Sequence, residues 1–101
     1  MSYVIGIAWF KDEIAYHRAL AIFKDPQDMP TSFEEWKSLV EKQCELVKAG
    51  GNIALRVELD PDQFVGWCAV HGFEPNAWGR TAFVNHMELE YQKTGQGATI
   101  E

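Results

Sequence analysis

Two of the three histidines stand four residues away from an acidic residue. His86 is followed by Glu90, and His17 is preceded by Glu13. Residues four apart lie on one face of a helix, so each imidazole could contact a carboxylate and take part in acid–base catalysis. Pairs of this kind are also common as plain contacts on a helix surface. The sequence leaves a small acid–base enzyme open as an alternative, but it shows no convergent set of nucleophile, base and anion-stabilising groups.

The third histidine, His71, stands three residues after Cys68, so both side chains could face the same way on a helix. A structural zinc site needs four ligands, and this pair supplies two. No Cys-x-x-Cys or His-x-x-x-His spacing completes the set. Cys44 and Cys68 both fall within apolar helical stripes, which predicts buried thiols. We expect no metal ion and no cofactor.

A candidate ligand site combines the two predicted strands. Gly6 and Ala8 leave little bulk on one face of the first strand. We expect the polar face of the second strand, with Arg56 and Glu58, to lie beside them as a shallow floor, with Trp9 and Phe10 as a wall. Such a floor could take a small molecule, which the sequence does not identify. The plainer interpretation is a solvent-facing sheet surface with a cross-strand ion pair.

The charge balance disfavours nucleic acid and anionic membranes as partners. Fifteen acidic residues face nine Lys and Arg, which gives a formal net charge of −6. The basic residues are scattered singly, whereas phosphate binding needs them clustered. The helices predicted at 61–71 and 76–93 could form a helix-turn-helix, but they lack the basic flanks of a DNA-reading version.

The first ten residues lack the basic region and small-residue cleavage site of a signal peptide. No apolar run approaches the roughly 20 residues that span a bilayer. We therefore expect a cytoplasmic protein.

The periodicity of apolar residues, together with the glycine, proline and helix-capping residues between the segments, predicts six elements in the order β-α-α-β-α-α. The expected elements are a strand at 3–10, helices at 11–23 and 32–49, a strand at 52–59, and helices at 61–71 and 76–93. Ser32 and Asp60 have the positions and types of helix N-caps. If each connection reverses the chain direction, the two strands are antiparallel, although the long loop at 24–31 weakens that inference. The fold predicted is a single α+β domain over 1–93, with a flexible tail over 94–101.

The aromatic content is high for 101 residues, at four Trp, three Tyr and six Phe. Trp36 and Trp67 fall on inward helical stripes and are expected to fill the core. Trp9 and Trp78 do not have so simple an explanation, and they mark a candidate interface or pocket. A two-stranded sheet has two open edges. We therefore predict a homodimer, formed edge to edge or through the last helix.

The chain resembles a family of small uncharacterised bacterial proteins over residues 5–83. The resembling segments are Ile-Gly-Ile-Ala-Trp-Phe at 5–10, Met-Pro with Phe-Glu-Glu-Trp at 29–36, Asp-Pro-Asp-Gln-Phe with Trp-Cys at 60–68, and Gly-Phe-Glu-Pro-Asn and Arg-Thr-Ala-Phe up to 83. The resemblance implies a free-standing bacterial cytoplasmic protein and transfers no site. We predict a small non-enzymatic binding or regulatory protein that acts as a homodimer. Its candidate binding or interface residues are Gly6, Ala8, Trp9, Arg56, Glu58, Trp78 and His86.

Overall fold

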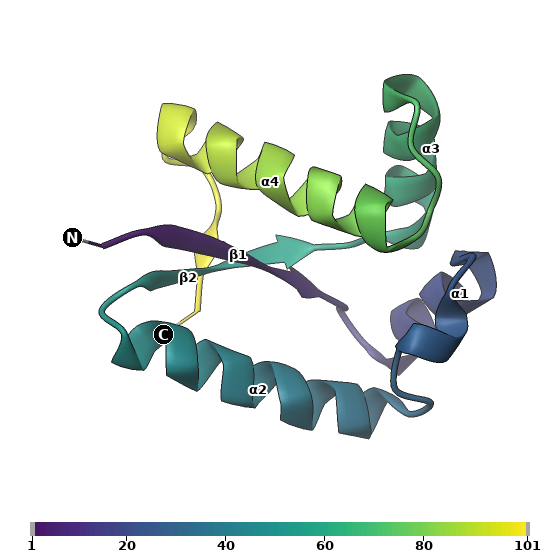
Figure 1. The fold of residues 1–101 in the computed structure, drawn as a ribbon, viewed down its shortest axis with the longest axis horizontal. Coiled ribbons are helices and arrows are strands. Elements are labelled where there is room, and N and C mark those ends of the chain that lie inside the picture. Colours follow the sequence, from purple (N-terminus) through teal and green to yellow (C-terminus); the bar gives the residue numbers. More distant parts are fainter. Residues whose placement is uncertain (1, 101) are drawn as a thin grey trace.

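The computed structural model describes residues 2–100 and places a small sheet between two long helices (Figure 1). The elements in chain order are β1 (Val4–Trp9), α1 (Glu13–Ile22), the 3-10 turn η1 (Pro26–Asp28), α2 (Phe33–Ala49), β2 (Ile53–Glu58), α3 (Pro61–His71), α4 (Ala77–Thr94) and β3 (Ala98–Thr99). The prediction of an α+β fold with four helices is confirmed. None of the helices within 2–100 is long and apolar enough to cross a membrane.

The first two strands are parallel, so the prediction of an antiparallel pair was wrong. Backbone hydrogen bonds from Ile53 N to Tyr3 O and from Leu59 N to Trp9 O, both 2.8 Å, fix the register at the two ends. The wrong direction came from treating each helix as one reversal of the chain. Helix α1 instead packs against α2 and α3 beyond the end of the sheet. Helix α2 alone brings the chain back, and β2 therefore starts at the same end as β1, as in other parallel crossovers.

The sheet has three strands, so the prediction of two was also wrong. Strand β3 pairs antiparallel with β2 inside the segment predicted as a tail. A strand of two residues is too short to show an alternating pattern, which explains why the sequence did not reveal it. The strand order is β1-β2-β3, which leaves β2 central and β1 with an open edge.

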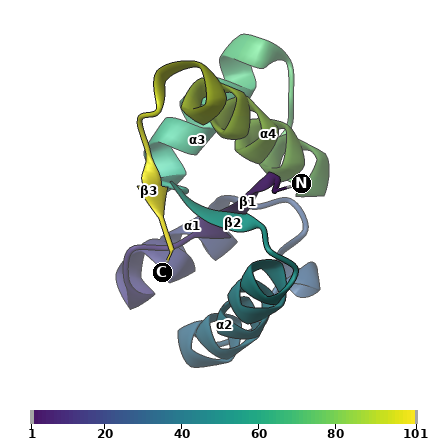
Figure 2. The ribbon, with the colours of Figure 1, turned by 90° about the vertical axis from the view of Figure 1, so that its left-hand side faces the viewer.

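Helices α2 and α4 cover opposite faces of the sheet (Figure 2). On the α4 side, a Cβ added to Gly6 would lie 2.6 Å from Val84 Cγ1, so the glycine permits a close approach of the helix. The α2 side is filled by Ile7, Ala54 and the aromatic side chains around Trp36. The most deeply buried side chains of the core are Phe10, Tyr16, Ala19, Ala54, Val57, Leu59, Phe64 and Cys68.

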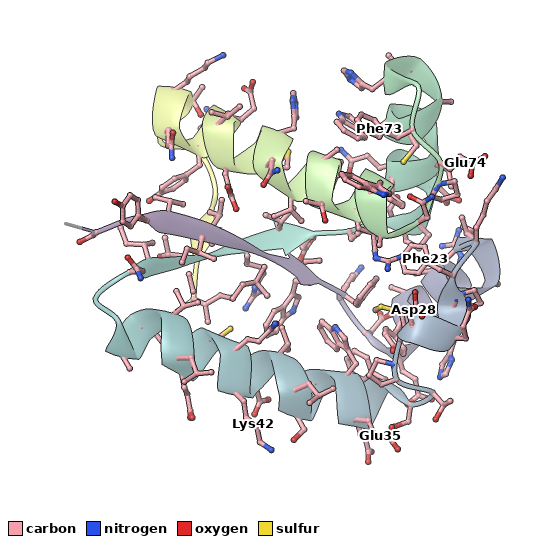
Figure 3. All side chains as sticks on the ribbon, in the orientation of Figure 1. Phe23, Asp28, Glu35, Lys42, Phe73 and Glu74 are labelled. Carbon is pink, nitrogen blue, oxygen red and sulfur yellow. The ribbon has the colours of Figure 1, made fainter. Side chains whose placement is uncertain are left out.

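Short polar residues begin the helices at the positions that the sequence indicates. Ser32 Oγ accepts a hydrogen bond from Glu35 N at 3.1 Å, and Asp60 Oδ2 accepts one from Gln63 N at 2.9 Å. Both predicted N-caps are therefore confirmed. Glu35 and Lys42 point away from the sheet on the outer side of α2 (Figure 3). The caps and the charged outer side together fix which stripe of α2 faces the core.

Candidate functional site

A groove of about 560 Å³ runs along the free edge of β1 between α2 and α4. Figure 1 looks onto this edge, with β1 in front of β2, and Figure 2 shows β3 on the opposite side of the sheet. The groove is lined by the β1 residues Ile5, Gly6, Ile7 and Ala8, by Val40, Gln43 and Leu46 of α2, and by Thr81, Val84, Asn85 and Glu88 of α4. Its volume lies within the range of known binding sites.

The floor of the groove presents backbone hydrogen-bonding groups. The carbonyls of Tyr3 and Trp9 accept hydrogen bonds from Ile53 N at the start of β2 and from Leu59 N just after its end. Because the N–H and C=O groups of successive strand residues point to opposite sides, those of Val4, Gly6 and Ala8 point away from β2. The hydrogen bonds found among residues 2–100 do not use the Ala8 amide. These backbone groups of β1 therefore face the groove and not β2.

One side chain already occupies part of this edge. The half-buried Glu88 accepts a hydrogen bond from Gly6 N at 2.7 Å through its Oε1. The Glu88 carboxylate can lie there because glycine has no Cβ: a Cβ added at Gly6 would lie 2.9 Å from the same oxygen. A carboxylate bonded to a backbone amide is one of the charged groups that discourage edge-to-edge pairing.

Both helices border the groove with exposed, uncharged side chains, which we call the α2 rim and the α4 rim. The α2 rim consists of Gln43 and Leu46 from the groove lining and the exposed Leu39 on the same helical face, and the α4 rim consists of Thr81 and Asn85 from the lining and the exposed Trp78 and Leu89 on the same face. These spacings of three and four residues place each set on one helical face. Leu46 is 74% exposed and Trp78 is 78% exposed. Large apolar side chains so exposed beside an open strand edge are typical of an interaction surface.

An ion pair holds one end of the groove together. Arg80 Nη1 and Nη2 donate to Asp25 Oδ1 and Oδ2 at 2.8 and 3.0 Å, and Asp25 Oδ2 also accepts from Ala77 N at 2.9 Å. The hydrogen bonds from Arg80 hold the pKa of Asp25 below its usual value. The Arg80 guanidinium lies 4.6 Å from the centre of the Phe23 ring. This contact ties the loop after α1 to the start of α4, where one wall of the groove begins.

The structure does not bring together the shallow floor expected from the sequence. In the parallel register, Gly6 lies beside Leu55 and Ala8 beside Val57. Arg56 and Glu58 point to the opposite face. The register decides this outcome, because each even-numbered residue of β1 lies beside an odd-numbered residue of β2, and a shift of one residue exchanges the two faces.

The two unexplained tryptophans lie in different surroundings. Trp9 packs edge-on against Trp36 with ring centroids 5.5 Å apart, and the Arg56 guanidinium lies 4.8 Å from its centre. Trp9 is thus part of the aromatic packing under α2. Trp78 projects into solvent from the α4 rim.

The histidines form no pair with the carboxylates that the sequence places near them. Among residues 2–100, no ion pair or hydrogen bond joins His86 to Glu90 or His17 to Glu13. His86 lies with His71 around Trp67, at ring-centroid distances of 5.7 Å from Trp67 and 6.0 Å from His71.

Both cysteines are free and buried, as predicted. Burial raises the pKa of the Cys44 and Cys68 thiols, so neither is activated as a thiolate. Groups of three or more metal-ligating side chains are absent from the described part of the chain.

The sequence analysis missed Glu88 and the rim residues other than Trp78, which it named as a candidate interface residue. The small Gly6 in the first strand indicated a close approach but not by which group. Comparison with protein-family models, with curated proteins and with solved structures found no match for this chain.

Proposed function

We propose that the protein is a small interaction protein that forms a homodimer by pairing the β1 edges of two copies. The observation that carries this proposal is the open β1 edge at the floor of the groove, with uncharged rims on both sides. An exposed strand edge is a template for a further strand. A second copy supplies the same edge, and the two can pair antiparallel about a two-fold axis.

The two-fold arrangement is favoured by what the rims contain. With the axis perpendicular to the sheet, the α2 rims of the two copies meet on one face, and the α4 rims meet on the other. Each rim then faces the same rim of the other copy. A charged residue on a rim would therefore meet a like charge and repel it. The rims as defined contain no charged residue, and the charged side chains that line the groove between them are Arg80 and Glu88.

A dimer interface of standard size would use a small part of the surface of each copy. The principal extents are 37 × 30 × 19 Å, and Figure 1 views the molecule along the shortest axis, with β1 in front of β2. A standard interface buries about 800 Å² on each partner. That is about one eighth of the 6375 Å² surface of one copy.

Other parts of this proposal come from the sequence. The resemblance to small bacterial proteins remains a prediction, and so does a binding or regulatory role. A cytoplasmic location is supported by the two unpaired cysteines, since such thiols are usual in reducing compartments.

The test is the light-scattering mass of the purified protein from micromolar to millimolar concentration. We expect the mass to rise from one subunit to two. Leu46→Glu, on the α2 rim, should weaken the dimer at least about tenfold, because it buries a carboxylate without a partner.

Ile14→Glu is the matched control. Ile14 is 73% exposed on α1, which contributes no residue to the groove, and the substitution adds the same charge. It should leave the dimer unchanged. A mass of one subunit at all concentrations would overturn the proposal, and so would equal effects of the two substitutions. Copurification of a small molecule or an extended peptide in the groove would assign the edge to a different occupant.

A further inference from the structure

We infer that Glu88 controls strand pairing at β1 by holding the Gly6 amide in the separate subunit. This inference rests on the proposed dimer and names the residue that sets its strength. Glu88 Oε1 lies 2.7 Å from Gly6 N, in the middle of the edge that the second copy must use. The side chain reaches this amide from α4, 82 positions later in the chain.

The hydrogen bond competes directly with the dimer. In an antiparallel ladder, the edge-facing residues of one strand exchange N–H···O bonds with the other. Gly6 and Ala8 are edge-facing residues near the centre of β1. A ladder that runs the length of β1 therefore needs the Gly6 N–H, and Glu88 must release it before the ladder closes. Among residues 2–100, no side chain accepts a hydrogen bond from the Ala8 N–H in this way. Of the two central edge-facing amides, one is therefore occupied and the other is available.

Charge adds a second cost to the dimer. The two-fold axis brings both copies of Glu88 toward the same interface. Each carboxylate loses its bond to Gly6 and part of its contact with water, and the two repel each other. The pairing is consequently weak and sensitive to substitution at this single position.

Two substitutions separate the hydrogen bond from the charge. Glu88→Ala removes both, whereas Glu88→Gln keeps an oxygen that can accept from Gly6 N and removes only the charge. We expect Glu88→Ala to tighten the dimer by about tenfold or more, which is the scale of one hydrogen bond to a charged group. Glu88→Gln should tighten it by less. Thermal unfolding of each variant checks that it is folded.

The experiment combines the light-scattering mass with amide hydrogen exchange of Gly6 followed by NMR. In dilute protein, the Gly6 amide should exchange slowly in the native chain, faster in Glu88→Ala, and at an intermediate rate in Glu88→Gln. Equal Gly6 exchange in dilute native protein and Glu88→Ala would overturn the inference.

The result also distinguishes failure of this inference from failure of the proposed function. If the native chain dimerises and Glu88→Ala dimerises no more tightly, the inference falls and the proposed function stands. If the native chain stays monomeric while Glu88→Ala dimerises, the inference stands and the native dimer falls. If both remain monomeric up to millimolar concentration, both fall.

Discussion

At the scale of single residues, the partly buried ion pair of Asp25 and Arg80 helps to hold the groove wall in place. The Arg80 and Asp25 side chains are 14% and 16% exposed, and the pair is bidentate. Such a pair has better geometry and less solvent screening than the exposed ion pairs of the same chain, such as Arg18 with Asp62. Asp25 also satisfies a backbone amide in the first turn of α4. Its carboxylate therefore stabilises both the loop after α1 and the start of α4.

We predict that Asp25→Asn lowers the free energy of unfolding by about 1–3 kcal/mol at neutral pH. The pKa of Asp25 is lower in the folded protein than its usual 3.8, so this contribution is complete above that pH and is lost as the pH falls through the folded value. The difference in the free energy of unfolding between the native and variant proteins should therefore become smaller below pH 3.8. Urea unfolding of both proteins at a series of pH values measures this difference.

The control for this prediction is Asp28→Asn on the same loop, where the side chain is exposed. It should change the free energy of unfolding by less than about 0.5 kcal/mol. Equal losses in the two variants, or a difference for Asp25→Asn that stays constant in acid, would contradict the stabilising role of the ion pair.

At the scale of elements, two glycines in helices have opposite structural meanings. Gly79 lies in α4 where that helix crosses the turn after α3, and an added Cβ would lie 2.1 Å from Glu74 O and 3.2 Å from Cys68 Sγ. Gly66 lies in α3 with no atom within 4 Å of the corresponding position. Gly79 therefore sets the distance between α4 and α3, whereas Gly66 makes no such contact.

We predict that Gly79→Ala lowers the free energy of unfolding by about 1–3 kcal/mol, because the backbone oxygen in its way cannot rotate aside. Gly66→Ala should raise it by about 0.5–1 kcal/mol, since alanine is the better helix former and meets nothing. Chemical unfolding of both variants provides the comparison. The same sign for the two substitutions would mean that helix propensity alone decides the effect.

The helices and the two longer strands could be predicted from the sequence, because caps, glycine stops and apolar periodicity are local. Ser32 and Asp60 are examples in which a residue type and its position were enough. The strand direction could not be predicted, since it depends on α1 lying beyond the end of the sheet. The groove could not be predicted either, because it also depends on how distant segments pack. Gly6 and Glu88 are 82 positions apart, and only the packing of α4 brings them together.

At the scale of the whole molecule, the sheet lies as a middle layer between α2 and α4, and its β1 edge has no neighbouring strand within 2–100. One edge of the sheet is the two-residue β3, whereas the other is the six-residue β1, which faces the groove between the α2 and α4 rims. The two edges differ because β3 is supplied by the segment after α4, and no segment within 2–100 pairs with the outer edge of β1. In the proposed dimer, that unpaired edge is the place where two copies meet.

The most direct measurement of this pairing is amide hydrogen exchange at Ala8 in dilute and in concentrated protein. The Ala8 amide faces the groove and has no partner among residues 2–100, so it should exchange rapidly in the separate subunit. Pairing of two β1 edges predicts that its exchange slows markedly as the concentration rises, together with the increase in mass. An Ala8 amide that exchanges at the same rapid rate in a sample shown to be dimeric would place the interface elsewhere and contradict the edge-to-edge dimer.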